Sequence, residues 1–68
     1  MNEKKPHYLM QFFKYDHLPD HLQEVSRPFC ELAEDMDKFL DIETPEKSAA
    51  FRKLLESKDC AVRSVLFK

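Results

Sequence analysis

The sequence predicts an all-α protein, an antiparallel helical hairpin with a short N-terminal arm that assembles into a helical homo-oligomer. Three observations predict it: an apolar repeat in the first half, a helix-start signal near residue 44, and a length of 68 residues. A chain this short buries only about 60% of the surface that its unfolded form exposes. Because such small domains are usually reinforced by disulfides, metals or association, one of these must support the hairpin.

The first helix is predicted over residues 18–41. Pro19 suits its first turn, whereas Pro28 lies inside the apolar pattern and must remove one backbone hydrogen bond. We predict a kinked helix, and the alternative is a short helix over residues 19–25 followed by a second one that Ser26 caps. Spacings of alternately four and three residues, typical of a packed helix face, separate the apolar residues Leu18, Leu22, Val25, Phe29, Leu32, Met36 and Phe39.

The second helix is predicted over residues 45–66. Thr44 is a good N-cap, Pro45 suits the first helical position, and Glu46 lies in the first turn. Two antiparallel helices hide only part of a wide apolar face, so this helix favours self-association. That face comprises Ala50, Phe51, Leu54, Leu55, Lys58, Ala61, Val62, Val65 and Leu66.

Residues 1–17 form the N-terminal arm, which is rich in aromatic side chains between Tyr8 and Tyr15. The arm is too short to be a domain and must pack on another apolar surface. Two packings are open at this point. The arm covers the open end of its own hairpin, or it packs on a neighbouring subunit.

Several functional classes are disfavoured by composition. The chain has no glycine, which excludes glycine-dependent phosphate loops, and no apolar run approaches the roughly 18 residues of a membrane span. The N-terminus has no apolar leader, which indicates a reducing cytoplasm. We therefore expect Cys30 and Cys60 to be two reduced thiols rather than a disulfide. His17 and His21 lack a third ligand at suitable spacing, and Ser26 lacks an oxyanion donor set. We therefore expect no metal, no cofactor and no catalysis.

Charge is distributed unevenly along the chain. Residues 31–46 hold seven acids and one base, for a net charge of −6, while the remaining residues hold ten bases and six acids, for +4. In an antiparallel hairpin this places negative charge at the turn and positive charge at the opposite end. Aromatic faces beside Arg and Lys suit a ligand that carries bases and phosphates. The basic end is expected to include Lys14, Arg27, Arg52, Lys58 and Arg63, near Phe12, Phe13 and Tyr15.

The same charges also fit a purely structural interpretation. Arg52 with Glu56, and Asp59 with Arg63, are spaced as ion pairs on a solvated helix face. Lys58 lies on the apolar stripe, where it either extends its ammonium group to solvent or binds a ligand. From charge and aromatic content alone, the candidate binding residues are Phe12, Lys14, Ser26, Arg27 and Lys58.

Three stretches, residues 13–19, 22–33 and 52–63, resemble the small phage proteins with a helical-hairpin domain that act as anti-CBASS sponges (the anti-CBASS protein 2 type). The resemblance rests on FKYDHLP, on LQEVSRPF with the following Leu32-Ala33, and on RKLLESKDCAVR. It covers most of the chain from Phe13 to Val65. This sequence departs from the family in its shorter length and in Pro28, where other members have a plain helix.

The resemblance implies a phage immune-evasion protein that binds cyclic di- and trinucleotide second messengers without cleaving them in the host cytoplasm. It also implies a homohexamer, with one pocket type between pairs of subunits and another near threefold contacts. The aromatic residue ahead of the first helix corresponds to Tyr15, which would stack on a base. The basic residue of the last helix corresponds to Arg63, which would hold a phosphate.

Two other binding classes are weighed beside this one. A protein-interaction module would dock its apolar stripes and acidic turn on a host or phage protein. A small nucleic-acid binder is disfavoured by the acidic pI of about 5.9 and by the absence of a dense Lys/Arg stripe, so no DNA or RNA partner is expected.

Overall fold

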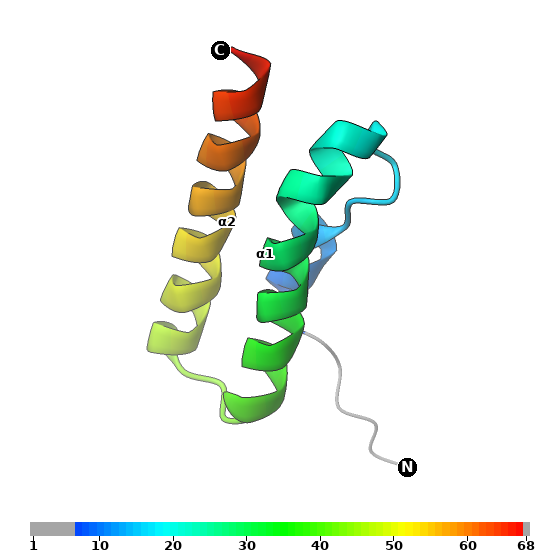
Figure 1. Ribbon diagram of the computed structural model, residues 1–68. Helices are drawn as coiled ribbons and strands as arrows, with labels where there is room; N and C mark the ends of the chain where they lie inside the picture. The colour runs from blue at the N-terminus through cyan, green and yellow to red at the C-terminus, as the bar shows by residue number, and fades with distance from the viewer. Residues whose placement is uncertain (1–6, 68) are drawn as a thin grey trace.

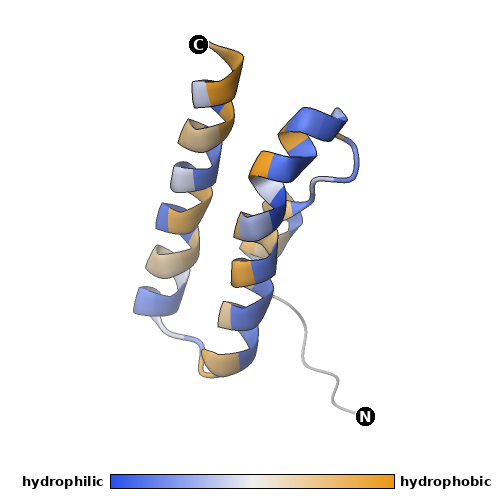
Figure 2. Cartoon of the chain, in the orientation of Figure 1, coloured by the Kyte–Doolittle hydropathy of each residue, from blue (hydrophilic) through white to orange (hydrophobic). Residues whose placement is uncertain are grey.

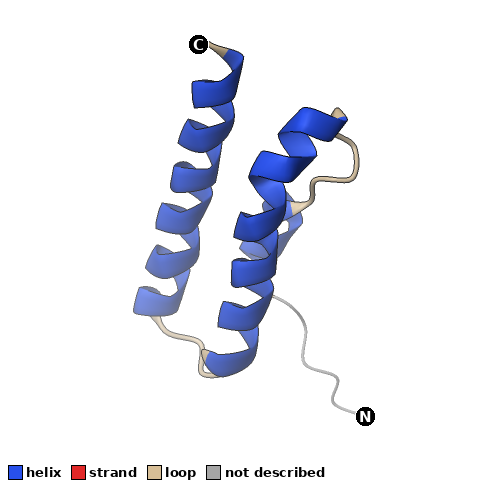
Figure 3. Cartoon of the chain, in the orientation of Figure 1, coloured by secondary structure: helices blue, strands red, loops and turns tan. Residues whose placement is uncertain are grey.

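The structure is a computed structural model that describes residues 7–67, and within this range it is helical without strands. A 3-10 helix, η1 (Tyr8–Phe13), precedes two long helices, α1 (Asp20–Phe39) and α2 (Pro45–Leu66). Figure 3 shows loops at the two connections and at the end of α2. The all-α class predicted from the sequence is confirmed.

The two long helices run antiparallel, side by side, and a short turn joins them (Figure 1). Overall the molecule measures 44 × 24 × 15 Å, the shape of a short rod. Both helices contact η1, which lies behind α1 in the view of Figure 1. The arrangement is therefore a helical hairpin with a third, shorter element across one side.

The first helix is shorter than the predicted range of residues 18–41, because both ends are set by local hydrogen bonds. Pro19 is the N-cap rather than a helical residue, and its carbonyl accepts from Leu22 and Gln23, each at 2.9 Å. The Gln23 amide folds back to donate to the Leu18 carbonyl at 2.7 Å. At the other end Leu40 leaves the helical conformation at φ −98°, ψ 70°.

Pro28 lies inside α1, which continues through it as one helix. The alternative of two helices separated near Ser26 is therefore wrong. The second helix has the bounds that the sequence predicts. Thr44 is its N-cap and accepts from the Lys47 backbone N–H at 3.0 Å, with Pro45 at the first helical position.

The described part of the arm, residues 7–17, packs on its own hairpin, and η1 lies along the middle of the two helices rather than over their open end. Leu9 and Phe13 of η1 are buried with Ala33 of α1 and Phe51 of α2. The Phe13 and Phe51 rings meet edge to face, with centroids 6.3 Å apart. The arm thus supplies half of this core cluster, which explains why its aromatic residues cannot be left unpacked.

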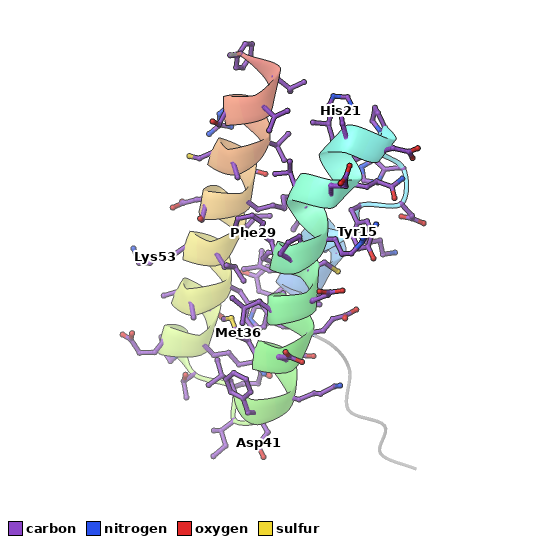
Figure 4. All side chains as sticks on the ribbon, in the orientation of Figure 1. Tyr15, His21, Phe29, Met36, Asp41 and Lys53 are labelled. Carbon is purple, nitrogen blue, oxygen red and sulfur yellow. The ribbon has the colours of Figure 1, made fainter. Side chains whose placement is uncertain are left out.

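Much of the predicted apolar surface stays partly exposed. Figure 2 shows apolar residues along both helices and at the far end of α2. Phe29 and Met36 lie between the helices, whereas Lys53 points away from them (Figure 4). One chain therefore covers only part of its apolar surface, and the large side chains left exposed are Tyr8, Phe12, Leu32, Phe39, Ile42, Leu66 and Phe67.

Two further features bear on the sequence predictions. Among residues 7–67, no helix has the length and apolar character needed to cross a membrane. Cys30 is half-buried and Cys60 is exposed, and both thiols are free.

Candidate ligand-binding site

A cleft of about 400 Å³ lies where the end of the arm meets the first turns of α1 and the second half of α2. It brings together five of the seven residues singled out from the sequence, although they come from three separate parts of the chain. These five are Phe12, Lys14, Ser26, Lys58 and Arg63, and the other lining residues are Gln11, His17, Leu18, Asp59 and Val62.

Lys58 connects α2 to the arm. Its ammonium group donates to the Phe12 carbonyl at 2.6 Å and lies 5.9 Å from the centre of the Phe13 ring. With 11% of its side chain exposed, Lys58 neither extends freely into solvent nor presents its full charge to a ligand. Its position on the apolar stripe is explained by this contact, which closes the inner wall of the cleft.

Ser26 is the most deeply buried residue of the cleft. It is fully buried in α1, and its hydroxyl has no hydrogen-bond partner. A serine hydroxyl within a helix can donate to the backbone carbonyl four residues earlier. The Ser26 hydroxyl makes no such hydrogen bond. A buried hydroxyl without a partner costs roughly 1–3 kcal/mol, so a ligand group that bonds to it recovers that cost.

Arg63 and Lys14 supply exposed cations at the cleft. The Arg63 guanidinium lies 3.4 Å from the Cys60 sulfur, and the predicted ion pair between Arg63 and Asp59 is absent from the described part of the chain. Asp59 instead lies 3.7 Å from the Lys58 ammonium. The Arg63 charge therefore remains available for an anion.

Tyr15 and Arg27 do not line this cleft. The Arg27 guanidinium lies over the Tyr15 ring, 5.7 Å from its centre, so the two side chains pair with each other across the loop and α1. Arg52, which was grouped with the basic end, lies nearer the turn of the hairpin and donates to the Tyr8 hydroxyl at 3.3 Å. The predicted basic end is thus divided between the cleft and contacts that hold the arm.

A larger cavity of about 800 Å³ lies between η1 and α1, and it is nearer to the turn of the hairpin than the cleft is. Its charged groups are mixed in sign, and Lys14 borders both this cavity and the cleft. Cys30 lies on its wall, where burial, followed by the negative charges of Glu34 and Glu31, raises the pKa of the thiol and Lys58 opposes that rise. A thiol with a raised pKa is a poor nucleophile at neutral pH.

The predicted acidic turn is partly neutralised by a residue that the sequence did not single out. Lys47 is buried at the start of α2, where its ammonium group lies 2.8 Å from Glu43 and 3.3 Å from Asp37. The charge distribution along the sequence predicts positive charge at the end of the hairpin opposite the turn. Lys47 is an exception, because it lies at the turn, directly after the acidic segment of residues 31–46.

His7 is the second residue that sequence reasoning missed. Its Nδ1 accepts from the Leu9 backbone N–H at 3.2 Å, and its Nε2 lies 3.1 Å from the Ser48 hydroxyl. The ring also stacks on Phe51 with centroids 4.6 Å apart. No local sequence signal marks it, since Ser48 and Phe51 lie more than 40 residues away, and its role here is to hold the arm.

Among residues 7–67 there is no group of three or more His, Cys, Asp and Glu side chains placed to hold a metal ion. No protein-family model matches this chain, and neither a curated protein nor a solved structure does. The resemblance described from the sequence therefore stays a prediction.

Proposed function

We propose that this protein binds cyclic di- and trinucleotide second messengers and sequesters them without cleavage. It would act as a phage immune-evasion protein in the host cytoplasm, as the anti-CBASS sponges that it resembles do. One observation carries the proposal: the cleft gathers an aromatic residue, three basic residues and a buried hydroxyl without a partner.

The cleft offers the groups that such a ligand needs. Phe12 is half-exposed at its edge, and its ring provides a face on which a nucleobase can stack. Arg63 and Lys14 provide cations for phosphates, with Arg63 able to donate two parallel hydrogen bonds. Ser26 lies at the inner wall of the cleft with its hydroxyl unpaired, and Lys58 fixes the Phe12 backbone before a ligand arrives.

Sequestration is stoichiometric, so it depends on tight binding and slow release. Rigid elements that hold the binding groups in place lower the entropy lost on binding. We propose that association of copies, in a hexamer as the resemblance implies, adds this rigidity. Tyr15 and Arg27 lie outside the cleft of one chain, and in such an assembly they would contribute from a neighbouring subunit.

The proposal is tested by calorimetry with cyclic GMP-AMP and cyclic tri-AMP. We expect saturable binding, which Arg63→Ala and Lys14→Ala each weaken by at least about tenfold, since a hydrogen bond to a charged group is worth roughly 1.5–3 kcal/mol. Lys53→Ala is the matched control, because Lys53 is exposed on α2 and points away from the helix pair (Figure 4).

Ligand recovered intact from the denatured complex would separate sequestration from hydrolysis. If a full panel of cyclic oligonucleotides gives only the heat of dilution, the proposed function is wrong.

A second candidate function is a protein-interaction module, and a surface at the turn favours it. Phe39 and Ile42 are exposed there beside a cavity of about 430 Å³ that also includes the acids Asp41 and Glu46. Apolar anchors with an acidic rim suit a partner that presents a basic, apolar segment. A stoichiometric partner that co-purifies from infected cells, with no nucleotide released on denaturation, would favour this function over the first.

A further inference from the structure

The cleft contains one acidic side chain among its cations. Asp59 lines it from α2, and about half of its side chain is exposed to solvent. A carboxylate repels phosphate, so a site that served phosphate alone gains nothing from it. Its presence indicates that the ligand carries hydrogen-bond donors as well as negative charge.

The carboxylate of Asp59 keeps most of its capacity to accept hydrogen bonds. Its contact with Lys58 is long, at 3.7 Å, and the same ammonium group makes its short bond to the Phe12 carbonyl. Arg63, four residues further along the helix, turns its guanidinium toward Cys60 instead. Two carboxylate oxygens can therefore receive donors from a ligand that lies in the cleft.

Among the nucleobases, guanine matches this acceptor best. Its ring N–H and its amino group are adjacent donors that can bond to the two oxygens of one carboxylate. Adenine and cytosine present one amino donor beside a ring nitrogen that accepts, and that nitrogen faces a carboxylate unfavourably. Uracil presents a single ring N–H between two carbonyl acceptors, so it also lacks the adjacent pair of donors.

We propose that Asp59 recognises guanine and makes the cleft selective for guanine-containing cyclic dinucleotides. This inference rests on the proposed function and names the base that the site prefers. Phosphate bound to Arg63 and Lys14 places negative charge near Asp59, so only a base that donates to both carboxylate oxygens offsets the repulsion. A paired hydrogen-bond contact of this kind typically discriminates between bases by about fivefold to a hundredfold or more.

The experiment compares cyclic di-GMP with cyclic di-AMP on the intact chain by calorimetry. The wild type is expected to bind cyclic di-GMP at least about tenfold more tightly. Asp59→Asn should weaken cyclic di-GMP and strengthen cyclic di-AMP, because an amide offers one donor and one acceptor. Removal of a charge by itself would strengthen both ligands, so the ratio of the two affinities isolates base recognition from electrostatics.

Asp35→Asn is the matched control, since it removes the same charge from an exposed position of α1 that borders none of the described cavities. It should leave the ratio unchanged. If both ligands bind and Asp59→Asn leaves the ratio as it was, this inference is wrong while the proposed function stands. If no cyclic dinucleotide binds, the proposed function fails and the inference fails with it.

Discussion

Two side chains near the core, Lys47 and Cys30, hold their protons more firmly in the folded protein than in the unfolded chain. A hydrogen bond to Glu43, opposed by burial and helped by Asp37, raises the pKa of Lys47 above its ordinary value of 10.5. Burial, with Glu34 and Glu31, raises the pKa of Cys30 above 9.0. For both groups the stability contribution is complete below the unfolded pKa and is lost as pH rises through the folded pKa.

We therefore expect these two groups to add no pH dependence to the free energy of unfolding at neutral pH and to lower it at alkaline pH. Cys30 should begin to contribute above about pH 9, and Lys47 above about pH 10.5. Urea unfolding at a series of pH values measures this, with Cys30→Ala removing the first decline and Lys47→Met the second.

Lys47→Met should also lower stability at neutral pH by about 2 kcal/mol, because it removes the buried ammonium group that pairs with Asp37 and Glu43. Lys53→Met, on the exposed side of the same helix, should change it by less than about 0.5 kcal/mol. A neutral-pH stability that Lys47→Met leaves unchanged would show that the ion pairs are not needed for folding.

Single residues divide clearly into those that the sequence could place and those that it could not. Thr44 and Pro45 were found because an N-cap and a first-position proline are local signals. Lys47 and His7 were missed because each has at least one partner on a distant element, which is α1 for Lys47 and α2 for His7. Lys58 was noticed as an anomaly on an apolar stripe, but its bond to the Phe12 carbonyl depends on where the arm packs.

At the scale of elements, α1 tolerates a proline in its interior. Pro28 has no backbone N–H, so the carbonyl of Glu24 loses the partner that an unbroken helix would provide. The apolar pattern keeps its spacing through Pro28, which is why continuity of the helix could be predicted. The helix ends were less predictable, because Pro19 and Leu40 are placed by turn geometry rather than by periodicity.

Replacing Pro28 with alanine should stabilise the protein. The substitution restores one hydrogen bond within the helix, which raises the free energy of unfolding by up to about 3 kcal/mol. Alanine also gives the unfolded chain more freedom than proline does, which lowers the net gain to roughly 1–2 kcal/mol. Glu31→Ala, also at an exposed position of α1, is the control and should have a small effect. A lower melting temperature for Pro28→Ala than for the wild type would mean that the proline makes a contact worth more than the hydrogen bond.

At the scale of the whole molecule, the arm and the hairpin together enclose a small core. The helical hairpin was predictable from periodicity, and so was the need for the aromatic arm to pack. Where the arm packs was not predictable, because the sequence allowed its own hairpin and a neighbouring subunit equally. The cleft follows from that placement, which brings Phe12 and Lys14 of the arm region against α2.

The remaining prediction concerns association of whole chains. The second half of α2 carries Ala61, Val62 and Val65, which are half-buried, and Leu66, which is 52% exposed. Because this surface continues the apolar face that predicts self-association, a second copy of the chain is the proposed occupant. Burying such side chains between copies stabilises the assembly by roughly 25 cal/mol for each Å² of apolar surface.

Sedimentation equilibrium at micromolar concentration should therefore give a mass well above the 8.1 kDa of one chain. Leu66→Asp should shift the distribution toward monomer, because it places a charge on the proposed contact surface. Ser64→Asp adds the same charge near the same end of α2, also at an exposed position, so it should leave the mass unchanged. A wild-type protein that sediments as a folded monomer would remove the subunit contacts on which slow release of a sequestered ligand depends.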